Sequence, residues 1–129
     1  MAEPGEGFYP QQTAIEAYGN GGFRFAGMSH KGSLLCLPTG MQAWEVASAN
    51  GLTLQSLAPV LAAADQIDVL FIGLGSDIVP IDPAIRVALR ERQVIVEAIG
   101  TGGAVRTYNV LLAEQRSVAA ALIAVESVR

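Results

Sequence analysis

The sequence has one cysteine, one histidine and one lysine among its 129 residues. One cysteine excludes an internal disulfide framework, and one cysteine with one histidine cannot build a Cys/His zinc site within a single chain. Because Lys31 is the only lysine, the glycine-rich stretches described below lack the lysine of a phosphate-binding P-loop. We therefore expect no metal site and no cofactor.

Charge is also scarce. Charged residues make up 16% of the chain, its net charge is −4, and its sequence pI is about 4.8. This acidity argues against a nucleic-acid binder that neutralises phosphates. The richest apolar runs, Val69–Leu74 and Val118–Val125, are far shorter than the roughly 20 residues of a membrane-spanning helix. With 51% hydrophobic residues, the composition predicts one soluble globular domain without a transmembrane segment.

The segment Met1–Gln12 carries no basic residue and no apolar run. It therefore lacks the features of a secretory signal and the arginines of a mitochondrial presequence. We expect residues 1–12 to form a flexible tail, residues 13–129 to form a single domain, and the protein to be cytoplasmic.

The first half of the chain is punctuated by glycines and predicts antiparallel strands. Ile15–Tyr18 and Phe23–Phe25 flank a Gly-Asn-Gly-Gly turn, which is typical of a β-hairpin. Ser33–Leu37 and Met41–Val46 form a second predicted pair on either side of a Pro-Thr-Gly break. His30 falls in an apparent turn between these pairs.

The second half alternates between helix and strand patterns. Helices are predicted over Leu54–Ala64 after the cap Thr53, from the cap Asp82 to Arg92, and over Ala104–Gln115; buried strands are predicted at Val69–Leu74 and Val94–Ile99. Ser117–Val125 suits either a helix, from its alanine run, or a final strand, which we favour. The order predicts a mixed α/β (α+β) fold, with an antiparallel first half and βαβ crossovers in the second.

Two predicted strands run into Gly-x-Gly: Gly73-Leu74-Gly75 and Gly100-Thr101-Gly102. The third small residue of a dinucleotide fingerprint is missing from both, so tight turns are the simpler interpretation. Ligands of open α/β sheets nevertheless gather at the carboxyl ends of strands. The candidate pocket at this edge comprises Gly75, Ser76, Asp77, Thr101, Arg106, Thr107 and Asn109. The alternative is that Thr107 and Asn109 bond nearby backbone and tie their helix to the loop after Gly75.

Seven of the eight basic residues are arginines. Arg86 and Arg90 share one face of a predicted helix, and arginine suits bidentate contact with carboxylates or phosphates. Arg86, Arg90, Arg106 and Arg116 are the candidate interaction surface, and an ordinary solvated helix face is the alternative.

No catalytic set is convincing. His30, Ser76 and Asp77 could form a triad on paper, but the Gly-x-Ser-x-Gly elbow is missing. Cys36 is expected to be a buried, inert strand residue, and Trp44 to be a core residue unless it is exposed for docking. We assign no catalytic residue.

Several motifs resemble the Mth938-like domain family of unknown function. They are Gly22-Phe23-Arg24, Gly32-Ser33-Leu34-Leu35, Pro38-Thr39-Gly40-Met41, Trp44, Ile67–Gly75 and, above all, Thr101 with Ala104–Arg116, which follows T-x-x-A-x-R-T-Y-N-x-L-x-x-E-G-R. The chain departs from that pattern at Gln115, where glycine is common, and at Gly100, where the family often has an aspartate that could serve pocket chemistry.

The resemblance, over residues 14–126, implies a compact domain of β+β/α layers. Bacterial members have no established enzymatic activity, and a eukaryotic relative resembles an assembly factor of mitochondrial respiratory complex I. The leading hypothesis is a non-catalytic accessory protein that binds another protein, such as a membrane-complex subunit or an assembly protein. The alternatives are a small-anion binder or enzyme using the crevice, and a homo-oligomer that uses the arginine face on itself.

Overall fold

The computed structural model describes residues 8–76 and 78–127. In this part of the chain, nine strands form two sheets. The strands are β1 (Phe8–Tyr9), β2 (Ala17–Gly19), β3 (Gly22–Phe25), β4 (Met28–Lys31), β5 (Ser33–Leu37), β6 (Gly40–Trp44), β7 (Val69–Gly73), β8 (Ile95–Ile99) and β9 (Val118–Leu122). The helices are α1 (Ala58–Ala62), α2 (Pro83–Glu91) and α3 (Thr101–Ala113), with short 3-10 turns η1 (Ala49–Gly51), η2 (Gln55–Leu57) and η3 (Ala64–Gln66).

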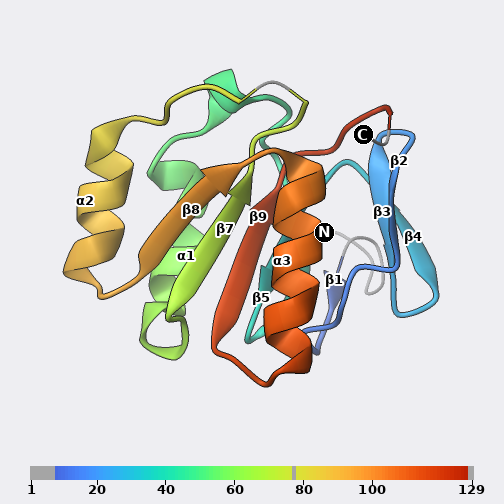
Figure 1. Cartoon of the computed structure of the whole chain (residues 1–129), viewed down its shortest axis with the longest axis horizontal. Coiled ribbons are helices and arrows are strands. Elements are labelled where there is room, and N and C mark those ends of the chain that lie inside the picture. The colour runs from blue at the N-terminus through green and yellow to red at the C-terminus, as the bar shows by residue number, and fades with distance from the viewer. Residues whose placement is uncertain (1–7, 77, 128–129) are drawn as a thin grey trace.

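The larger sheet is mixed, with three antiparallel and two parallel strand pairings. Its strand order is β1-β6-β5-β9-β7-β8, with β5 antiparallel to both β6 and β9, and β7 parallel to both β8 and β9. The smaller sheet has the order β2-β3-β4 and is antiparallel throughout. Figure 1 shows the smaller sheet beside α3, away from α2. The predicted mixed α/β fold, with an antiparallel first half and crossovers in the second, is confirmed.

Two apolar cores lie on opposite faces of the larger sheet. One joins the sheet to α1 and α2 through side chains such as Leu70, Val60 and Leu89. The other joins it to α3 and the small sheet through side chains such as Phe71, Tyr108 and Phe25. The sheet is therefore the middle layer, and α3 is the helix that links it to the small sheet (Figure 1).

The final element is a strand, as favoured from the sequence. All five residues of β9 are buried, and the strand lies between β5 and β7 in the centre of the sheet. Its alanines alternate between the cores, with Ala119 and Ala121 facing one and Ala120 the other. This central position outweighs the helix propensity of the alanine run, because both faces of the strand are covered.

The structure departs from the sequence predictions most clearly in three places. Phe8 and Tyr9 of the predicted tail form β1, which pairs with β6, while residues 1–7 lie outside the described part. His30 lies in β4 rather than in a turn, because Met28–Lys31 pairs antiparallel with β3. Helix α3 begins at Thr101, three residues before the prediction, and includes the two glycines that resembled a loop.

The other helix predictions hold in outline. Asp82 caps α2, since its Oδ1 accepts a hydrogen bond from the backbone N of Ala84 at 2.9 Å. The predicted Leu54–Ala64 helix is divided into η2 and α1, and Thr53 Oγ1 accepts from Ser56 N at 3.0 Å at its start. In the described residues, no helix combines the length and the apolar character needed to cross a membrane.

The lone thiol belongs to the core beneath α3. Cys36 on β5 is fully buried, and burial raises the pKa of its thiol. Tyr108 on α3 is equally inaccessible, burial raises the pKa of its phenol, and its hydroxyl donates to the carbonyl oxygen of Thr13 at 2.7 Å. Both groups are therefore held protonated, which agrees with the expectation that Cys36 is inert.

These raised pKa values predict a loss of stability at high pH. The folded state keeps the Cys36 and Tyr108 protons, whereas the unfolded chain releases them above the ordinary pKa values of 9.0 and 10.0. The free energy of unfolding should thus be unaffected by these groups below pH 9 and should fall above it, by about 1.4 kcal/mol per pH unit for each ionising group. Urea unfolding between pH 7 and 11 measures this, and Cys36→Ala should make the decline shallower. An equal decline in that variant would exclude the thiol as a contributor.

Candidate functional site

The carboxyl ends of β7, β8 and β9 meet at the N-terminus of α3, and Thr101 ties them together. Its side chain is fully buried. Thr101 Oγ1 accepts a hydrogen bond from Gly75 N at 2.9 Å and donates one to Ile123 O at 2.7 Å. The backbone N of Thr101 also donates to Gly75 O at 3.1 Å. One hydroxyl thus joins the segments that follow β7 and β9 to the first turn of α3.

Gly73 and Gly75, the glycines of the first Gly-x-Gly, allow the close contacts at this junction. A Cβ at Gly73 would lie 3.0 Å from Thr101 Cα, which is tighter than nearly all side-chain contacts, so the start of α3 would have to shift. Gly75 has a φ of +89°, in the left-handed region that favours glycine. The structure therefore gives both glycines a local structural reason, in agreement with the simpler interpretation of the motif as a tight turn.

Two hollows flank the segment after β7. A small hollow of about 140 Å³ lies at the start of α3, between Tyr18, Gly75, Ser76, Ile78, Gly100, Thr101, Gly102, Gly103, Val125 and Ser127. A larger, shallow hollow of about 460 Å³ lies on the other side, between residues 47–50, 74–76, Val79 and 123–127. The structure thus brings together Gly75, Ser76 and Thr101 of the predicted pocket, whereas Asp77 lies outside the described residues.

The remaining pocket candidates do not line either hollow. Thr107 Oγ1 donates to Gly103 O at 3.0 Å, within its own helix. Asn109 holds the backbone of Ile15 at both ends, accepting from its N and donating to its O, each at 2.8 Å. Both side chains bond backbone, as the alternative interpretation proposed, but Asn109 secures the segment before β2 and not the loop after Gly75. Arg106 is exposed, and its guanidinium lies over Gly102 and Gly103 at the rim of the small hollow.

Tyr18 is the residue of this site that the sequence did not indicate. Its hydroxyl lies over Gly102, at the rim of the small hollow. It comes from β2 of the other sheet, and no local pattern connects positions 18 and 102. The conformation of the segment before β2, which Asn109 holds, brings it there.

His30 and Trp44 are each occupied by structural contacts. His30 Nε2 lies 2.9 Å from Ser33 O, and its ring lies 6.5 Å from that of Phe25. Trp44 is buried and its Nε1 donates to Ser56 O at 2.8 Å, so it is a core residue rather than a docking one. Among the described residues, no group of three or more His, Cys, Asp or Glu side chains is placed to hold a metal ion.

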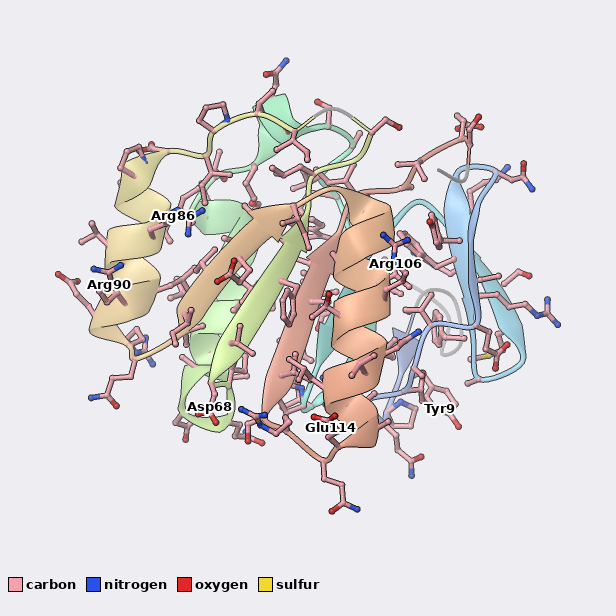
Figure 2. The ribbon with its side chains drawn as sticks, in the orientation of Figure 1. Tyr9, Asp68, Arg86, Arg90, Arg106 and Glu114 are labelled. Carbon is pink, nitrogen blue, oxygen red and sulfur yellow. The ribbon has the colours of Figure 1, made fainter. Side chains whose placement is uncertain are left out.

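The four candidate arginines do not form one surface. Figure 2 shows Arg86 and Arg90 on α2 at one side of the molecule and Arg106 on α3, nearer the small sheet. Arg116 follows the far end of α3. Arg86 Nη1 donates to Val96 O at 2.7 Å, which fixes its guanidinium at the edge of β8. In residues 8–76 and 78–127 the ion pair within 4.0 Å is Arg24–Glu16, so the α2 arginines have no described carboxylate partner.

The protein is thus a small mixed α/β domain. Its helix α3 begins at Thr101, at the edge of the larger sheet where β7, β8 and β9 end. The chain matches the family described as a protein of unknown function (DUF498/DUF598) over residues 15–123, and it belongs to that family. A solved Mth938-like domain from Bordetella pertussis has the same fold, with a TM-score of 0.77 at 24% identity, over 99% of this chain and 94% of that one.

Other relatives are more similar in sequence. A structure described as an outer membrane protein from Bartonella henselae is 47% identical with a TM-score of 0.88, covering 92% of this chain and 99% of that one. An uncharacterized protein of Rhodobacter capsulatus is 38% identical over 94% of this chain and 90% of its own length. The NADH dehydrogenase (ubiquinone) 1 alpha subcomplex assembly factor 3 of Xenopus tropicalis is 34% identical over 84% of this chain, which spans 60% of that factor's length.

The Thr101 junction predicts a specific stability difference. Thr101→Val retains the shape but leaves the half-buried Gly75 N and the buried Ile123 O without their partner, which should cost about 2–4 kcal/mol. Thr101→Ser retains the hydroxyl and should lose at most about 1.5 kcal/mol, the scale of one buried methyl group. Urea unfolding of the two variants provides the comparison. Equal losses would show that the hydroxyl contributes no more than the methyl group.

Proposed function

We propose that this protein is a non-catalytic accessory factor that binds another protein during assembly of a membrane-associated respiratory complex. The observation that supports this most directly is the similarity to assembly factor 3 of the NADH dehydrogenase 1 alpha subcomplex, at 34% identity over 84% of this chain. The described site agrees with a binding role, because its polar side chains are used to hold backbone rather than to face a reactant.

The α2 arginines are the proposed contact with that partner. They are exposed, they lie on one helix flank, and they have no carboxylate partner among the described residues. Because Arg86 is held against the edge of β8, its guanidinium loses less conformational freedom when it binds a carboxylate. A partner segment that carries carboxylates matches this flank.

Charge reversal tests this contact. The Arg86→Glu/Arg90→Glu double variant should reduce recovery of a respiratory-complex subunit or assembly protein by at least about tenfold in affinity capture from its own cells, since two attractive contacts become repulsive. Lys31→Glu, on exposed β4, is the matched control for a single reversed charge. Circular dichroism and the unfolding midpoint establish that the variants are folded.

The proposed role in assembly of the respiratory complex can be tested separately from the α2 contact. Deletion of the gene should lower the amount of assembled NADH dehydrogenase in native gels of the membranes, and the wild-type gene should restore it. Normal assembly after deletion, together with capture that yields no subunit or assembly protein of the complex, would contradict the proposal. Normal capture by the double variant would instead contradict only the assignment to α2.

A further inference from the structure

One face of the larger sheet is left open over β8. Val94 and Val96 point into the core beneath α1 and α2, whereas Ile95 and Glu97 point to the face on which α3 packs. Both are exposed there, Ile95 to 64%. Figure 1 shows that α3 lies across this face while β8 has no helix in front of it. Parallel strands are ordinarily covered on both faces, so this part of the sheet lacks a layer.

The open face is bounded by α2 on one side. A hollow of about 310 Å³ lies between Arg86, Arg90, Gln93, Val94, Ile95 and Val96. The arginines of α2 therefore lie beside the outer edge of β8, and Ile95 lines the same hollow. Because Ile95 N donates to Asp68 O, within the ladder to β7, the neighbouring Val96 carbonyl points away from β7, and Arg86 occupies it. Arg86 therefore blocks another strand from pairing with the edge of β8 at Val96. The face of β8 that carries Ile95 and Glu97 remains available for contact.

Helix α3 bounds the other side with an exposed apolar side chain. Gly103 approaches the side chain of Ile99 on β8, and Val110, seven residues later, lies on the same flank of the helix. Val110 is 56% exposed. Ile95 and Val110 are thus two large apolar side chains presented to solvent on one side of the molecule.

The charges on this face are of both signs. Arg90 and Glu97 are exposed, and within the part of the chain that the structure describes neither has an ion-pair partner within 4.0 Å. An acidic partner segment would satisfy Arg90 at the α2 flank but would be opposed by Glu97 if it extended over the face of β8. A second copy related by a two-fold axis presents Glu97 to Arg90 and Arg90 to Glu97, which satisfies both.

We infer that the β8 face, defined as Ile95, Glu97, Val110 and the α2 arginines, is a homodimer interface. Ile95 lies near the two-fold axis and packs against the second copy, and Arg90 pairs with Glu97 of that copy. This interface would cover the α2 flank, so self-association and the proposed partner binding would exclude one another. The test uses purified protein without any partner, so its failure would leave the proposed function standing.

The test is the oligomeric state of the full chain, measured by sedimentation and light scattering. The wild type should be a dimer at tens of micromolar. Arg90→Glu and Glu97→Arg should each raise the dimer dissociation constant at least about tenfold, because two symmetric ion pairs become like-charge contacts. Ile95→Thr, which keeps the β-branched side chain of a strand residue, should also weaken the dimer. Lys31→Glu should leave it unchanged.

Mixing distinguishes this interface from any other. An equimolar mixture of Arg90→Glu and Glu97→Arg restores both pairs in the mixed dimer and should recover near wild-type affinity. A monomeric wild type at 100 µM or more, on the order of the weakest useful dimers, would overturn the inference. So would a dimer insensitive to Ile95→Thr and the charge variants, or a mixture that stays monomeric.

Discussion

The hydroxyl of Thr101 is the contact on which the edge of the larger sheet at the carboxyl ends of β7 and β9 depends. It is fully buried and bonds the backbone on both sides, to Gly75 N and Ile123 O. A buried hydroxyl that satisfies two backbone groups at once holds their relative position, because either group left alone would be desolvated without a partner. The start of α3 and the segments after β7 and β9 are therefore fixed as one unit.

That arrangement also gives several polar side chains near this edge a structural role. Carboxyl ends of parallel strands commonly hold ligands because loops there can present free polar groups. Here Thr101 is saturated by backbone, Asn109 is used to hold Ile15, and Thr107 bonds its own helix. Thr101 and Asn109 thus connect elements and Thr107 bonds within α3, while the two hollows near the edge are lined largely by glycine, alanine and serine.

Most elements could be predicted because each carries a local signal. The apolar run of β7 ends in glycine, Asp82 and Pro83 mark the start of α2, and the hairpin turn carries its glycines. The misjudged features have different causes. The Asn109–Ile15 clamp spans 94 positions, beyond the reach of any local pattern. Strand β4 pairs with β3 across the two-residue turn Ala26-Gly27, so its hairpin is local, but alanine in that turn is not a typical turn signal. The grouping of Gly75, Ser76 and Thr101 was predictable from strand direction alone, whereas the approach of Tyr18 was not.

The contacts that hold α3 also determine which part of the larger sheet is left uncovered. Helix α3 is fixed at its start by Thr101 and along its length by Tyr108 and Asn109, which hold the segment before β2. A helix anchored toward the small sheet covers that side of the larger sheet and leaves the Ile95–Glu97 part of β8 uncovered on the same face. The exposure of Ile95 and Glu97 is thus a consequence of the contacts that position α3, and these are the side chains through which we propose that β8 meets a second copy.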